Sequence, residues 1–173
     1  MTVAQQLDQD TSFTPNADNT RLLRDAFGRF ATGVTIVTAA SDQGPVAITA
    51  NSFSSVSLTP PLVLWSPDRA SRRFPYFANA EHYAIHVLAA DQDDLCWQVA
   101  KDAFGLKQLS LAHNARGVPL LDNCLARFEC RRVALHEAGD HMIVLGQVDR
   151  ATLREGGDAL TFFKGQMGCI AAQ

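Results

Sequence analysis

The 173-residue chain has little charge and no excess of positive charge. Charged residues make up 19%, and 15 Lys and Arg stand against 18 Asp and Glu, for a net charge of -3. Nucleic-acid-binding proteins usually carry a strong basic excess, so we expect no nucleic-acid partner. No apolar run reaches the roughly 18 residues of a membrane-spanning helix, and the first 20 residues lack the basic and then apolar pattern of a signal peptide. We therefore expect a cytoplasmic protein with no membrane partner.

Familiar catalytic and metal-binding signatures are also missing. The sequence has no G-x-G-x-x-G, no Walker A motif and no G-x-S-x-G, which removes the sequence support for a Rossmann fold, a P-loop and a hydrolase nucleophile elbow. Its four cysteines form no C-x-x-C pair, so we expect them to be reduced and mostly packed. The histidines of HEAGDH at 136–141 stand five residues apart, whereas a helical zinc site needs four. We predict no metal site.

Hydrophobic residues make up 47% of the chain, enough to bury the core of one domain. We predict a flexible N-terminal arm over residues 1–18, which are polar and aperiodic, and one domain over residues 19–173. Apolar residues between Leu22 and Phe30 recur at the spacing of an amphipathic helix. Asn19 or Thr20 is positioned to cap this helix, and we expect it to end at Gly33.

Most of the remaining pattern predicts β strands. Residues 34–38 (VTIVT) are β-branched, residues 41–44 read as a turn, and residues 45–50 start a second extended run, as in a hairpin. Further strand candidates are residues 62–65, 83–88, 126–135, 142–148 and 160–163. A short helix is expected over residues 91–101, capped at its first residue, and residues 104–123 read as a long connection over the barrel. Many short strands with few helices favour a mainly β, closed antiparallel barrel over a doubly wound sheet.

The stretch 49–62 (TANSFSSVSLTPPL) is rich in small hydroxyl residues, Asn and Pro. Accessible backbone N–H groups beside hydroxyl donors suit a polar heterocycle with a phosphate tail. The alternative is an edge strand with serines facing water, which the composition alone favours.

A cluster of three arginines, Arg69, Arg72 and Arg73, follows this stretch and matches a dianionic phosphate. A solvated basic loop is the alternative interpretation. His141, after Gly139-Asp140, is on general grounds more typical of a turn or barrel mouth than of a catalyst. We expect structural or surface roles for the other histidines, which are His82, His86, His113 and His136.

Four segments together resemble one family. They are GVTIVT at 33–38, TANSFSSVSL at 49–58 followed by Pro60-Pro61, Asp91-Gln92, and Gly139-Asp140-His141 with Gly146 and Val148. This combination, spread over about residues 22–168, resembles the flavin reductase family, the FMN-binding split barrel of the reductase components of two-component flavin-dependent monooxygenases. Where many members of that family have Asn, this chain has His86.

The resemblance implies a split β-barrel that binds FMN or FAD and takes a hydride from NADH or NADPH. It implies a homodimer that supplies reduced flavin to a partner monooxygenase, with no catalytic protein residue, because the cofactors carry the hydride transfer. His141 would contact the nicotinamide. The implied flavin-binding residues are Thr49, Ala50, Asn51, Ser52, Ser55, Val56, Ser57, Ser66, Arg69, Ser71 and Arg72.

Two other functions stay open at this point. A non-enzymatic flavin-binding protein would share the hydroxyl-rich stretch but would not turn over NAD(P)H. A split-barrel oxidase of the pyridoxamine-phosphate type would need basic residues beyond those holding FMN, and outside 69–73 the only tight cationic cluster is Arg127, Arg131 and Arg132. The Gly-Asp-His sequence favours the reductase.

Overall fold

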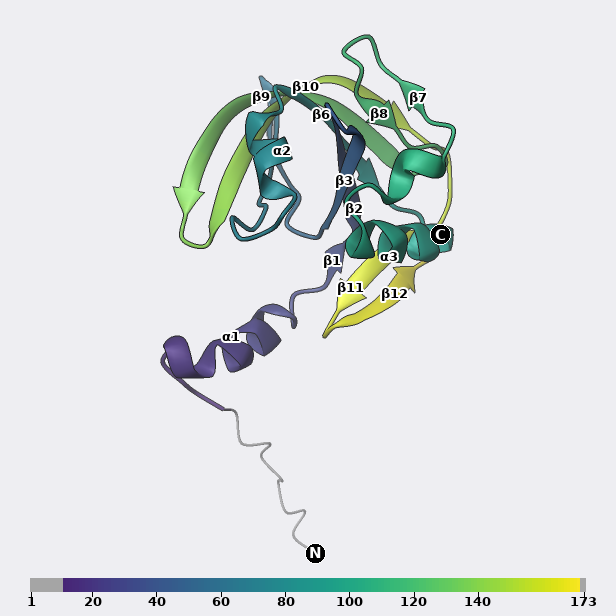
Figure 1. Cartoon of the computed structure of the whole chain (residues 1–173). Helices are drawn as coiled ribbons and strands as arrows, with labels where there is room; N and C mark the ends of the chain where they lie inside the picture. Colours follow the sequence, from purple (N-terminus) through teal and green to yellow (C-terminus); the bar gives the residue numbers. More distant parts are fainter. Residues whose placement is uncertain (1–10, 172–173) are drawn as a thin grey trace, which may run out of the picture.

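The computed structural model describes residues 11–171, which form a mainly β fold (Figure 1). Seven strands pair in the order β3-β2-β6-β9-β10-β5-β4, and every neighbouring pair is antiparallel. These strands are β2 (Thr35–Ser41), β3 (Gly44–Ala50), β4 (Ser54–Leu58), β5 (Pro61–Trp65), β6 (His82–Val87), β9 (Ala126–Ala138) and β10 (His141–Leu153). The mainly β prediction is confirmed.

The sheet rolls around one core. Val46 of β3 and Trp65 of β5 come from opposite ends of the strand order, yet both are fully buried in the same apolar cluster with Val37, Ile85 and Val144. Side chains from both ends of a sheet reach one cluster only if the sheet curls. The edge strands β3 and β4 are not paired with each other, so the barrel is split.

Smaller elements lie outside the barrel, and α1 projects away from it (Figure 1). One minor sheet consists of β1 (Thr32–Gly33), β11 (Ala159–Phe163) and β12 (Gln166–Ile170). The other consists of β7 (Ala112–His113) and β8 (Pro119–Leu120). The α-helices are α1 (Thr20–Phe27), α2 (Phe74–Asn79) and α3 (Asp93–Lys101), with 3-10 turns at Ala17–Asn19, Ala90–Gln92 and Gly105–Gln108. A second apolar cluster packs α3 against the outer face of the first hairpin, through Ile36, Ala47, Cys96 and Val99. Strand β2 is therefore buried on both faces, which explains its unbroken β-branched run.

His86 joins three parts of this architecture. Its side chain is fully buried, with Nδ1 3.0 Å from the Ile36 carbonyl oxygen and Nε2 accepting a hydrogen bond from the Leu121 N–H at 3.1 Å. Burial lowers its pKa from 6.5 to about 4. A neutral ring with Nδ1 as donor satisfies both contacts, so the structural role expected for His86 agrees with its position.

Several predicted boundaries were wrong. The first helix ends at Phe27, where the Gly28 N–H closes the last turn on the Arg24 carbonyl, and not at Gly33. The helix predicted over residues 91–101 is α3, which begins at Asp93 after a 3-10 turn and has no side-chain cap at Asp91. The six-residue helix α2 and the strands β1, β7, β8 and β12 were not predicted, β4 corresponds to the edge strand given as an alternative for the hydroxyl-rich stretch, and β9 and β10 run longer than expected.

The predicted connection at 104–123 joins α3 to β9 but contains a 3-10 turn and the β7–β8 pair. The Thr38 hydroxyl holds it by donating to the Pro119 carbonyl at 2.6 Å. Cys96, Cys124 and Cys130 are buried free thiols, whereas Cys169 is exposed.

Of the predicted arm, residues 1–10 lie outside the described residues, and residues 11–16 are irregular. Within residues 11–171, no helix is long and apolar enough to cross a membrane. In the same range, no group of three His, Cys, Asp or Glu side chains is arranged to hold a metal ion.

Candidate functional site

A cavity of about 350 Å³ opens where the ends of β3 and β5 meet the start of β10. It collects residues from four separate stretches of the chain. Its lining comprises Ile48, Thr49, Ala50, Asn51, Ser52, Trp65, Ser66, Pro67, Asp68, Ser71, Arg73, Ala100 and His141. The cavity therefore unites the first four residues of the hydroxyl-rich stretch with the loop after β5 and with the Gly-Asp-His turn.

Two hydroxyls of this stretch hold the cavity walls together. The Ser52 hydroxyl accepts from the Ser66 N–H at 2.9 Å and lies 3.3 Å from the Ser66 carbonyl oxygen, to which it donates. The Thr49 hydroxyl donates to the Cys96 carbonyl of α3 at 3.2 Å. These bonds fix the strand end, the loop and the helix relative to one another, and Asn51 is left exposed at the rim.

The loop at 66–73 and the start of β10 are joined through their backbones. The Arg69 N–H donates to the Asp140 carbonyl at 2.9 Å, and the Met142 N–H donates to the Pro67 carbonyl at 3.1 Å. Asp68 and His141 form an isolated antiparallel bridge between these two bonds. This pairing brings His141 to the cavity, about 75 residues after the loop that it faces.

Arg73 is the arginine of the predicted cluster that lines the cavity. Its Nη2 donates to the carbonyls of Val99 and Ala100 at 2.8 and 2.9 Å, at the C-terminal turn of α3, where a cation is favourable. Its Nε is buried without a hydrogen-bond partner. A buried donor without an acceptor is costly, so this N–H is suited to an anionic ligand.

The other two arginines of the cluster lie outside the cavity lining. Arg69 makes an ion pair with Glu137 at 3.8 Å on the surface, and Arg72 is exposed. The cluster as a whole was predicted to match a phosphate, and the flavin-binding residues implied by the family resemblance included Arg69 and Arg72 but not Arg73. The spacing of the three arginines holds no signal that singles out Arg73.

The His141 side chain is hydrogen-bonded to the carboxylate of its chain neighbour, Asp140. Its Nδ1 lies 2.8 Å from Oδ1 of Asp140, and this hydrogen bond, together with the charge of the imidazole, lowers the pKa of Asp140. With Nδ1 engaged in this way, Nε2 is the ring atom available to a ligand. The His141 side chain is 43% exposed at the cavity wall.

Ser55, Val56 and Ser57 do not line the cavity. They lie on β4, a largely exposed edge strand with an irregularity in its pairing to β5 between Ser55 and Ser57. An edge strand of this kind matches the sequence alternative for this stretch. Within the stretch only residues 49–52 line the cavity, and flavin contacts at Ser55, Val56 and Ser57 stay predictions.

Comparison with known proteins assigns this arrangement to a family. The sequence model of the flavin reductase like domain matches residues 27–171. The FMN reductase (NADH) SmoA of Agrobacterium fabrum is 48% identical over the whole of both chains. The reductase component of the flavin-dependent trigonelline monooxygenase of Acinetobacter baylyi is 45% identical over 76% of this chain, which spans only 43% of that protein.

Solved structures agree. BorF, the flavin reductase component of a bacterial two-component tryptophan halogenase, superposes with a TM-score of 0.82 at 37% identity, covering 89% of this chain and 99% of BorF. The NADH:FAD oxidoreductase SgcE6 of Streptomyces globisporus, in complex with NAD and FAD fragments, gives a TM-score of 0.84 at 32% identity, covering 92% of this chain and 98% of SgcE6. The chain belongs to the flavin reductase family and has its split-barrel fold.

Proposed function

We propose that this protein is an NADH:flavin oxidoreductase that reduces FMN or FAD and supplies reduced flavin to a partner monooxygenase. One observation carries the proposal: the family-matched fold gathers residues 49–52, Ser66, Arg73 and His141 around one cavity. The names of relatives support it, since they include an FMN reductase (NADH), an NADH-dependent flavin reductase and reductase components of monooxygenases. NADH is the proposed donor because two of these names specify it.

The cavity residues fit a flavin. We propose that the strand end at 49–52 contacts the polar edge of the ring system, with Asn51 at the rim free to turn toward it. The buried Nε of Arg73, together with Ser71, is assigned to the phosphate, because the guanidinium is already held in place by α3 and its Nε has no acceptor within the protein. Orientation of this kind costs little entropy on binding.

The nicotinamide side of the cavity is assigned to His141. Asp140 holds its imidazole by Nδ1, which leaves Nε2 for the dinucleotide. The flavin supplies the chemistry when bound, by accepting at N5 a hydride from nicotinamide C4. The chain therefore needs no acid, nucleophile or metal for that step, and its residues act by holding two rings in contact.

We further propose that the working unit is a homodimer. Helix α1 has no buried residue: Leu22 and Phe27 on the helix and Phe30 after it expose 38%, 69% and 78% of their area. An eight-residue helix is marginal in water without packing. We assign to the second copy both the cover of α1 and further walls of the cavity, because a volume of about 350 Å³ is small for a flavin together with a nicotinamide. The domain division at residue 18 and the cytoplasmic location stay predictions.

Steady-state turnover tests the function. NADH oxidation in the presence of the protein should depend on added FMN or FAD and should rise in proportion to protein concentration. His136→Gln serves as a control, since His136 is exposed and away from the cavity. Flavin binding without acceleration of NADH oxidation would favour the non-enzymatic flavin-binding protein and contradict the proposal.

A further inference from the structure

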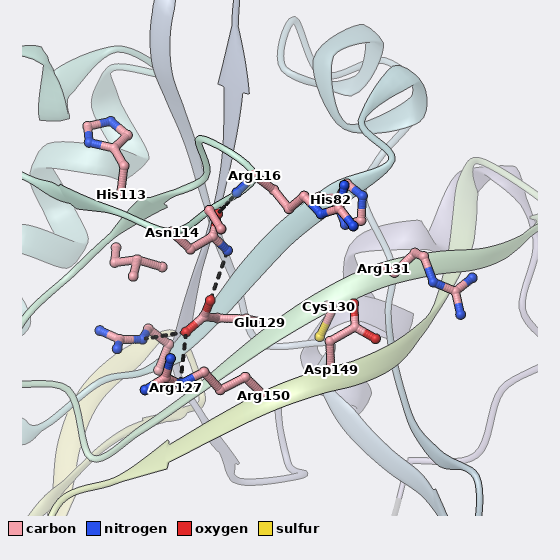
Figure 2. A pocket seen from close by; sticks show the side chains of 12 residues that line it. His82, His113, Asn114, Arg116, Arg127, Glu129, Cys130, Arg131, Asp149 and Arg150 are labelled. Atoms are coloured by element: carbon pink, nitrogen blue, oxygen red, sulfur yellow. Dashed lines mark hydrogen bonds and ion pairs between the residues drawn. The ribbon is translucent and has the colours of Figure 1, made fainter.

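A second cavity, of about 740 Å³, lies on the outer face of the barrel (Figure 2). It shares no lining residue with the candidate flavin cavity. Strands β6, β9 and β10 supply its floor, and the turn between β7 and β8 covers one side. We call it the arginine groove; it is lined by His82, His113, Asn114, Ala115, Arg116, Leu120, Arg127, Glu129, Cys130, Arg131, Asp149 and Arg150.

The groove has the opposite charge to the chain as a whole. Four of its lining residues are arginines and two are carboxylates, so it carries a net positive charge even with both histidines neutral. The whole chain has a net charge of -3. An isolated concentration of positive charge in an acidic protein attracts anions locally, since low-dielectric walls focus the field of the charges that line them.

Glu129 lies among the arginines of the groove and contacts two of them (Figure 2). Its carboxylate lies 3.8 Å from Nε of Arg127 and 4.0 Å from Nε of Arg150, and it accepts from the Asn114 amide at 2.9 Å. The Asn114 side-chain oxygen in turn accepts from the N–H groups of Arg116 and Val118. The carboxylate thus ties the covering turn to strand β9 and orients two guanidinium groups.

Arg127 and Arg150 have guanidinium N–H groups that lack a close hydrogen-bond acceptor. Nε of Arg127 is buried without a hydrogen bond, and its two Nη contacts, with the Leu121 carbonyl and the Thr152 hydroxyl, are long at 3.4 Å. The Arg150 side chain is 75% exposed, and Glu129 is too distant for a hydrogen bond to it. One carboxylate at these distances does not satisfy two guanidinium forks, which prefer paired contacts with carboxylate or phosphate oxygens.

We propose that the arginine groove binds a phosphate-bearing ligand of nucleotide size. Charge and donor geometry favour phosphate oxygens, and the volume lies in the range of about 300–1,000 Å³ that holds drug-sized molecules. Leu120 and the rings of His82 and His113 offer flat or apolar surface to the body of such a ligand. This site is separate from the proposed flavin and nicotinamide cavity and does not rest on the proposed function.

ADP is the probe for this site, titrated calorimetrically into the full-length protein with and without saturating FMN. ADP should bind in both conditions, and adenosine, which lacks the charge, should bind at least tenfold more weakly. Arg116→Gln and Arg150→Gln should each weaken ADP binding about tenfold and leave the KM for NADH unchanged. Lys101→Gln is the matched control, because Lys101 is an exposed cation on α3 outside the groove.

Four outcomes would overturn the proposal. The first is undetectable ADP binding. The second is ADP binding that competes with NADH and keeps its affinity in both groove variants. The third is a change of oligomeric state in Arg116→Gln or Arg150→Gln by light scattering, since the groove would then be filled by a second copy of the chain. Pyrophosphate binding as tight as ADP would contradict the nucleotide size. Because NADH–flavin turnover is measured separately, failure of this site is distinguishable from failure of the proposed function.

Discussion

The buried histidine of β6 gives the fold a defined sensitivity to acid. His86 has a pKa near 6.5 in the unfolded chain and about 4 in the folded protein, because burial disfavours the imidazolium. Between these values the unfolded chain binds a proton that the folded protein does not. Stability is therefore fully present above about pH 7 and is lost as the pH falls from 6.5 toward 4. The difference corresponds to about 3 kcal/mol.

Urea unfolding of the flavin-free protein at fixed concentration, from pH 7.5 to pH 4.5, measures this loss. Carboxylates also contribute to acid destabilisation, so the informative quantity is the difference between the parent protein and His86→Asn. The amide does not titrate, and the variant should lack about 2–3 kcal/mol of the acid-dependent loss. His136→Asn, at an exposed position, should follow the parent. An NMR titration of His86 with a midpoint near 6.5, or equal acid slopes in parent and variant, would refute this reasoning.

Three further substitutions have expected outcomes. Gly146→Ala should destabilise the fold by about 2 kcal/mol or more in thermal unfolding, because its Cβ would lie 2.0 Å from the Tyr83 hydroxyl oxygen; Gly33→Ala, with nothing within 4 Å, should have little effect, and equal effects would contradict this. Arg73→Met should weaken FMN binding about tenfold or more while changing riboflavin binding less, as loss of a charge-assisted bond of about 1.5–3 kcal/mol implies; equal losses would remove the phosphate role. His141→Ala should lower kcat/KM for NADH about five- to thirtyfold and leave flavin affinity unchanged, and unaltered NADH kinetics would leave the nicotinamide site unassigned.

The parts of the fold that could be predicted are those with a strong local signal. The β2–β3 hairpin follows from a β-branched run and a turn, and these are local properties of the chain. Strand β4 could be given only as one of two alternatives, because its serines have weak strand propensity and it forms by pairing with β5. The length of α1 was overestimated because its apolar spacing continues to Phe30, which does not pack on the barrel.

The candidate site also contains residues that a local motif predicts and residues that only a tertiary contact places. Residues 49–52 and His141 carried recognisable motifs, and the structure brings both to one cavity. The choice among Arg69, Arg72 and Arg73 could not be made from sequence. It depends on which side chain reaches the last carbonyls of α3, 26 and 27 residues further along the chain. A tertiary contact of that kind leaves no trace in the spacing of three neighbouring arginines.

Hydride transfer from NADH to flavin is the central claim, and anaerobic stopped-flow mixing measures it directly. Protein with bound FMN is mixed with NADH, or with NADH deuterated at nicotinamide C4, and the loss of the oxidised flavin absorbance is followed. Rapid loss of that absorbance, slowed by deuterium, is the predicted result, because the C4–H bond breaks as the hydride reaches N5. Absorbance that stays unchanged after mixing with NADH, while FMN remains bound, would contradict the assignment of this protein as a flavin reductase.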